Sequence, residues 1–259
     1  MKSKNHRLPG GFSLVEILVV IVIVIVVAGL ALTMSLKAMI SARGSKETDN
    51  LHQAGLALNV HVAEAGRFPV GWNAAAQISW ADLIIKDQFN GELKPTQMPM
   101  FWSPLLVKDV PANLDSEAVT HFAANPAIMT EGADDGTGTV VPKFTLLSTQ
   151  LTRPSEQIVL CGAVSKSAAA PYRASHPVLW EMEAKIGGPS TDGKPPQLDP
   201  DNANSAISFP ADATKKENFG SMPDFFRYGN RKGQFFFADG HVESMTPADH
   251  REKNWAVSY

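Results

Sequence analysis

The stretch FSLVEILVVIVIVIVVAGLALTMSL, residues 12–36, is apolar throughout except for one carboxylate, Glu16, and a few small polar residues. As a helix rising about 1.5 Å per residue it would extend about 37 Å, enough to span the roughly 30 Å hydrocarbon core of a bilayer with some tilt. Its Val and Ile content favours a strand, but a single lipid-facing segment must satisfy its backbone hydrogen bonds internally, which only a helix can do. The stretch is therefore predicted to be a transmembrane helix.

The predicted helix continues beyond the apolar stretch to about Gly66. Over residues 37–66, apolar side chains recur at helical spacing with polar residues between them, as in a helix that covers one side of a folded domain. Gly66 suits a C-terminal cap, and Pro69 discourages continuation. The expected core positions are Leu51, Ala54, Leu58, Val62 and Ala65, and the expected polar positions are Lys46, Glu47, Asp49, Asn50 and Gln53.

The apolar stretch is too long for a secretory signal peptide, because it continues for about twice the usual apolar length without a convincing cleavage site. It is predicted to stay in the membrane as a single span. Three basic residues precede it and three follow it, so the positive-inside rule does not set its orientation. They are Lys2, Lys4 and Arg7 on one side and Lys37, Arg43 and Lys46 on the other.

Glu16 is costly in this position. An acidic side chain at the bilayer centre costs about 2.5–3.5 kcal/mol on insertion scales, and less near the interface. Glu16 lies one helical turn inside the apolar run, so its carboxylate can extend to the headgroups or can pair with a positive charge inside the membrane. Local physical chemistry leaves both interpretations open.

The stretch GGFSLVEILVV, residues 10–20, resembles the processing site of type IV prepilins and type II secretion pseudopilins. The resemblance implies that a prepilin peptidase cuts between Gly11 and Phe12 and that Phe12 becomes the N-methylated first residue. It implies that Glu16 pairs with the amine of a neighbouring subunit. It also implies a bacterial inner-membrane protein, with the leader of residues 1–11 in the cytoplasm and the head, residues 67–259, across the membrane.

Two stretches of the head resemble a group of prepilin-type proteins. RPSEQIVL is one, and FADGHVE matches a motif in which a histidine precedes an Asp-Gly pair by nine intervening residues. Gly229 stands at the position of that histidine, with Arg227 and Tyr228 beside it. The motif histidine is therefore absent, and no role of that histidine is carried over to this chain.

Local patterns in the head predict a helix and several strands. SWADLIIKDQF indicates a short helix with Trp80, Leu83 and Ile84 towards the core. AVTHFAANPAIM indicates a strand that enters a turn at Asn125, and EQIVLCGAV indicates a buried strand after a turn at Pro154. GQFFFADGHVESM indicates a hairpin, with Asp239 and Gly240 where a tight turn requires positive φ.

Acidic loops are the only candidates for a metal site. EGADDGTGTVV is predicted to be an acidic, Gly-rich loop in which Asp134 and Asp135 could bind calcium, and LDPDNAN, residues 198–204, is a similar candidate. The first has adjacent acids without the alternating oxygen ligands of a calcium site, and the second lacks the Gly and the terminal Glu of a calcium-binding hand loop. Solvated turns are therefore favoured, and no cofactor is predicted.

The remaining residues suggest no catalytic centre. Asp239 and His241 are interpreted as part of a turn, and His121, His176 and His250 are scattered without ligand spacing. We find no phosphate loop, nucleophile elbow or zinc motif.

Cys161, the single cysteine, is interpreted as a small buried side chain, and it excludes an intrachain disulfide. The formal net charge of −3 gives little support to nucleic-acid binding.

The sequence therefore predicts an α+β, pilin-like fold, in which a long N-terminal helix packs on a head with a small antiparallel sheet. The expected function is structural, not enzymatic: a subunit of a type II secretion pseudopilus or type IV pilus-like filament, with other such subunits, the peptidase and membrane lipid as partners. A single-span tethered enzyme or ligand-binding protein is the alternative. The sequence does not decide between a pilus and a pseudopilus, or between a major and a minor subunit.

Overall fold

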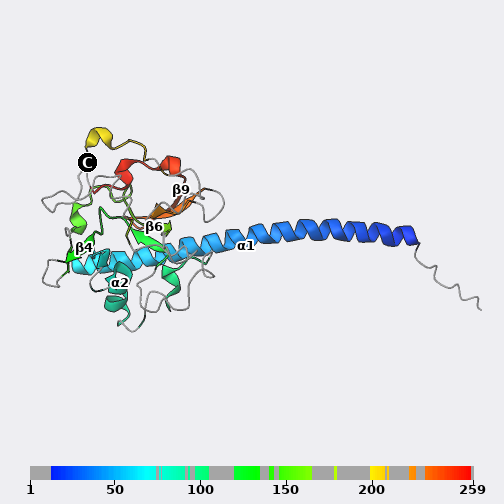
Figure 1. Ribbon diagram of the computed structural model, residues 1–259, viewed down its shortest axis with the longest axis horizontal. Coiled ribbons are helices and arrows are strands. Elements are labelled where there is room, and N and C mark those ends of the chain that lie inside the picture. The colour runs from blue at the N-terminus through cyan, green and yellow to red at the C-terminus, as the bar shows by residue number, and fades with distance from the viewer. Residues whose placement is uncertain are drawn as a thin grey trace, which may run out of the picture. The chain divides into compact units, whose positions relative to one another are not determined.

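A computed structural model describes residues 13–73, 76, 78–90, 93, 97–104, 120–134, 140–142, 146–164, 178–179, 199–207, 209, 222–225 and 231–257. The chain divides into two compact units, Met1–Ala42 and Arg43–Tyr259. The fold is α+β, with one long N-terminal helix and two small sheets (Figure 1).

Helix α1, Leu14–Ala65, confirms the predicted continuous helix. Its large apolar side chains between Leu14 and Ile40 are all 48–81% exposed. In the part of the chain that the structure describes, α1 is the one helix long and apolar enough to cross a membrane.

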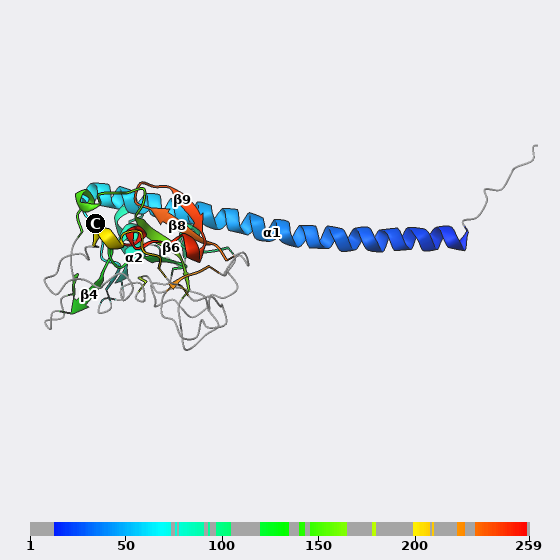
Figure 2. The ribbon, with the colours of Figure 1, turned by 90° about the horizontal axis from the view of Figure 1, so that it is seen from above.

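The second half of α1 buries one face against the larger sheet (Figure 2). The predicted core positions Leu51, Ala54, Leu58 and Val62 are buried, whereas Ala65 is exposed at the last residue of the helix. Glu47 and Asn50 were expected to be solvated but are buried as well. They lie on the same helical face as Leu51 and Ala54, and polar partners elsewhere in the fold compensate their burial.

Gly55 lets this face of α1 approach the sheet. A Cβ atom built at Gly55 would lie only 2.3 Å from the ring of Phe236 in strand β8, Gly233–Phe237. The side chain of Phe236 therefore fills the space that any larger residue would need. The helix and the sheet come together at a glycine because the ring lies directly over the helix backbone.

The larger sheet has the order β3-β6-β8-β9, with β7 also paired to β6, and every pair is antiparallel. The central strand is the predicted buried strand, β6, and Cys161 within it is fully buried as expected. The strands are β3, Phe122–Ala124; β6, Ile158–Val164; β7, Met222–Pro223; β8, Gly233–Phe237; and β9, Val242–Met245.

The second sheet, of order β2-β1-β4-β5, was not expected from the sequence. It contains one parallel pair, β1 with β4, so the head is not restricted to one antiparallel sheet. The predicted acidic loop begins and ends in paired strands, because β4 and β5 form an antiparallel pair. The strands are β1, Trp72–Asn73; β2, Ile78–Ser79; β4, Glu131–Asp134; and β5, Val140–Pro142.

Helix α2, Trp80–Gln88, begins at a capping box formed by Ser79 and Asp82. Trp80 and Ile84 are buried as predicted, but Leu83 is half-buried and Ile85 takes the core position instead. Short 3-10 helices are Pro99–Phe101, Ser148–Gln150, Pro200–Asn202, Pro247–Asp249 and Glu252–Asn254.

The predicted hairpin joins β8 and β9 through a three-residue loop. The N–H of Phe237 donates to the carbonyl of His241 at 2.9 Å, and the N–H of Gly240 donates to the carbonyl of Phe237 at 3.0 Å. Gly240 has φ +101°, whereas Asp239 does not have a positive φ. The expectation for Asp239 was therefore wrong, because a three-residue loop needs the left-handed conformation only at its last residue.

Candidate functional site

The first turn of α1 holds the acid that the sequence singled out. The backbone N–H of Ser13 donates to Oε2 of Glu16 at 2.7 Å, and the N–H of Glu16 donates to Oγ of Ser13 at 3.2 Å. This reciprocal pair is a capping box, which satisfies two backbone donors that the start of a helix otherwise leaves unpaired. The sequence reading missed it, although Ser-x-x-Glu ahead of an apolar run is its usual signature.

The capping box gives Glu16 a role within its own chain. It does not use up the carboxylate, because two carboxylate oxygens offer about four acceptor positions. Gly11 and Phe12, the predicted cleavage and methylation residues, lie outside the described residues. The arrangement can thus hold a carboxylate at the beginning of an exposed apolar helix surface and leave it able to accept a further donor.

The head contains a buried polar cluster around α1. The hydroxyl of Ser103 donates to the Glu47 carboxylate, and the N–H of Ser103 donates to Nδ1 of His121 at 2.8 Å. The side-chain amide of Asn50 donates to the carbonyl of Trp102 at 2.8 Å. Each of these polar side chains is no more than 3% exposed.

The cluster contains a serine, a histidine and an acid, but they are not arranged for nucleophilic catalysis. In a Ser-His-acid triad the histidine accepts the proton of the serine hydroxyl. Here the Ser103 hydroxyl donates to Glu47, and His121 accepts from the backbone instead. Complete burial also keeps substrate away, so the contacts attach α1 to the Phe101–Ser103 region.

The two calcium candidates lie only partly within the described residues. Among the described residues, no group of three or more His, Cys, Asp or Glu side chains could hold a metal ion. Asp134 lies in strand β4, and Asp135 is outside the described residues. The carboxylate of Asp199 accepts from the N–H of Asp201 at 3.0 Å, so it caps the short helix Pro200–Asn202.

Asp239 and His241, which were predicted to be part of a turn, lie at the exposed hairpin between β8 and β9. His241 Nδ1 and Asp239 Oδ1 are 2.5 Å apart, and the His241 ring stacks on Phe237 with centroids 4.2 Å apart. Both residues therefore contact their own turn. Of the other histidines singled out, His121 and His250 are buried, and His176 lies outside the described residues.

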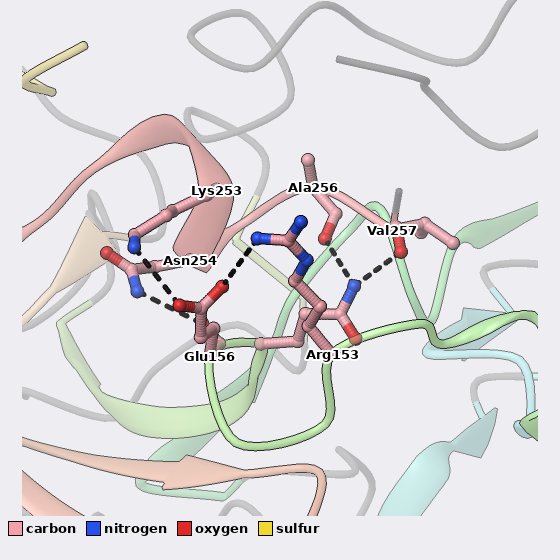
Figure 3. A network of polar contacts seen from close by, with 7 residues as sticks. Arg153, Glu156, Lys253, Asn254, Ala256 and Val257 are labelled. Carbon is pink, nitrogen blue, oxygen red and sulfur yellow. Dashed lines mark hydrogen bonds and ion pairs between the residues drawn. The ribbon is translucent and has the colours of Figure 1, made fainter. Parts of the chain in front are cut away.

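The RPSEQIVL stretch holds the C-terminal segment (Figure 3). Oε1 of Glu156 pairs with Nζ of Lys253 at 3.1 Å, and the Glu156 carbonyl accepts from the Asn254 side chain at 3.0 Å. Arg153 lies 3.6 Å from the other Glu156 oxygen. The side-chain amide of Gln157 donates to the carbonyls of residues 256 and 257. Gly229, the position of the missing motif histidine, lies outside the described residues.

Comparison of the chain with protein-family models, with curated proteins and with solved structures finds no match.

Proposed function

We propose that this chain is a prepilin-like structural subunit of a type II secretion pseudopilus or a type IV pilus-like filament. The observation that carries the proposal is the single acid, Glu16, held at the beginning of an exposed apolar helix directly after the Gly11–Phe12 junction. A membrane tether needs neither this acid nor this junction, so both features favour assembly over simple anchoring.

The proposed assembly step is an ion pair between subunits. Cleavage after Gly11 creates an α-amine at Phe12, and the amine of one subunit pairs with the Glu16 carboxylate of the next. An amine and a carboxylate attract far more strongly in a low-dielectric environment than in water. Such a contact joins two different surfaces of identical chains, and a repeated offset of this kind generates a helical filament.

Processing tests the proposal directly. The full chain is produced in bacteria with and without a prepilin peptidase, extracted from the membrane, and analysed by intact mass and N-terminal sequencing. We expect the peptidase to remove residues 1–11 and the new N-terminus, Phe12, to carry one methyl group. A Gly11→Val variant, which enlarges the residue before the cut bond, should keep its leader, whereas Gly10→Ala should be processed.

An intact leader on the membrane-extracted wild-type chain, in cells with active peptidase, would remove the basis of the proposal. The chain would then be better described as a single-span tethered protein.

A further inference from the structure

The C-terminal segment Thr246–Val257, termed here the C-terminal strap, is held from two sides. From one side come the contacts of Glu156, which Figure 3 shows, and the hydrogen bonds that Gln157 donates to the carbonyls of residues 256 and 257. From the other, the N–H groups of residues 252 and 253 donate to the carbonyls of Ser205 and Ala203, at 3.0 and 3.1 Å. The strap places Trp255 fully in the core.

His250 lies in the middle of the strap and is completely buried. Four aromatic rings surround it, with centroids 4.5–5.8 Å from the imidazole, and neither ring nitrogen has a hydrogen-bond partner in the described part of the chain. The rings belong to Phe209, Phe225, Phe235 and Trp255. A protonated imidazole has two N–H donors and a positive charge. The four surrounding rings supply no hydrogen-bond acceptor for these donors.

Few charged groups offset the cost of protonating His250. Burial lowers its pKa from 6.5 to about 3; the neighbouring Asp249 opposes this shift, and Arg251 adds to it. Strand β8 carries no charged residue between Gly233 and Phe237. Among the described residues, the other titratable groups on the strap and on the segments packed against His250 are Glu252 and Lys253 on the strap, Arg231 and Lys232 ahead of β8, Asp224 before Phe225, and Asp199 and Asp201 ahead of Phe209.

We propose that the C-terminal strap is an acid-released element: it is closed while His250 is neutral and opens when His250 takes up a proton. This inference is independent of the proposed assembly function.

The direction of the pH effect follows from the linkage between proton binding and strap opening. The open strap exposes His250, which then binds a proton with its ordinary pKa of 6.5, whereas the closed strap excludes the proton down to a pKa of about 3. Closure is therefore fully favoured above pH 6.5 and weakens as the pH falls below it. For this one group, the opening equilibrium constant rises about 90-fold between pH 7.5 and pH 4.5.

Hydrogen exchange of the full chain in detergent micelles at pH 7.5 and 4.5 tests the strap. Protection factors are used because they correct for the intrinsic pH dependence of exchange. We expect strap amides to lose about 90-fold protection at pH 4.5 while β6 amides stay protected. This pH lies above the ordinary pKa of 3.8 of Asp249, which hydrogen bonds from Thr246 lower further, so that carboxylate stays ionised.

The decisive variant is His250→Phe, which cannot take up a proton and should keep the strap protected at pH 4.5. His250→Gln, neutral at both pH values, replaces it if the larger ring prevents folding. His241→Phe, at the exposed hairpin, is the matched control and should lose strap protection like the wild type.

Three results would overturn the proposal. One is equal strap protection of the wild type at both pH values. Another is an equal loss in the strap and in β6, which would mean that the whole head unfolds in acid. The third is a loss in the folded His250→Phe or His250→Gln protein that matches the wild type.

Discussion

Glu16 serves its own helix, and in the proposed assembly it also binds a second chain. Its carboxylate completes the capping box with Ser13, which stabilises the first turn of α1. Its charge is not needed for that purpose, because glutamine serves equally at this position of a capping box. The hydrogen bonds of the capping box do not require the charge, whereas binding a cation does, so substitution can separate the two roles.

Glu16→Gln keeps the acceptor for Ser13 and removes the charge. We expect membrane insertion to become easier, since a neutral side chain costs less in lipid, while assembly falls. Leaving an amine unpaired at each contact costs roughly 3–5 kcal/mol if the pair is buried. Cross-linking of membrane-embedded subunits, at equal abundance, measures the effect.

Ser13→Ala is the matched control, because it removes half of the capping box and keeps the charge. Its cross-linking should stay close to wild type, and Glu16→Ala should assemble as poorly as Glu16→Gln. If Glu16→Gln cross-links like the wild type while Glu16→Ala and Ser13→Ala fail, Glu16 acts only as a cap.

At the scale of elements, α1 has two different surroundings along one helix. Between Leu14 and Ile40 its apolar side chains are exposed, whereas from Glu47 to Val62 one face is buried in the head. The buried face depends on close approach to β8 at Gly55 and on polar anchors at Glu47 and Asn50. Shape and hydrogen bonding thus attach the helix to the head, in addition to apolar burial.

Gly55→Ala should destabilise the head, although alanine favours a helix by about 0.5–1 kcal/mol over glycine. The added Cβ would lie 2.3 Å from the Phe236 ring, so the helix or the ring must shift. Overpacking of this kind costs about 1–3 kcal/mol. Thermal unfolding of the head, followed by circular dichroism, should therefore occur at a lower temperature than in the wild type.

Gly29→Ala is the control for this substitution. It places the same methyl group on α1 where nothing lies within 4 Å, so the unfolding temperature of the head should not change. An unchanged melt of Gly55→Ala would show that the helix does not pack against Phe236 in solution.

At the scale of the whole molecule, the chain divides after Ala42, beyond the predicted membrane span. The unit Arg43–Tyr259 has its own core, in which the second half of α1, both sheets and Trp255 of the strap participate. A unit with its own core can fold alone. We therefore expect the head's core to form without the predicted membrane span of α1.

A fragment of residues 43–259 should be soluble, with a mixed helix and strand spectrum and one cooperative thermal transition. A shorter fragment that begins at residue 67 lacks Leu51, Leu58 and the other core residues of α1, and should not fold. Circular dichroism and sedimentation compare the two. A disordered 43–259 fragment under native conditions would contradict the independent core.

The sequence by itself determined the features that depend on local pattern and solvent. An apolar run of this length, followed by a helical repeat, predicted α1 from end to end, and apolar composition with a turn signal predicted β6 and the β8–β9 hairpin. These predictions hold because a helix satisfies its backbone within itself, and because a tight turn needs a residue such as Gly240. The capping box at Ser13 could have been predicted in the same way.

Only the tertiary structure decided which segments meet. Glu47 and Asn50 look like surface residues until partners more than fifty positions away supply their hydrogen bonds. Strand β4 of the second sheet has the sequence Glu-Gly-Ala-Asp, which does not favour a strand, and it forms because β1 and β5 pair with it. His250 is also buried by tertiary contacts: Phe209, Phe225 and Phe235 come from other segments of the chain, and no local pattern specifies that they will surround it.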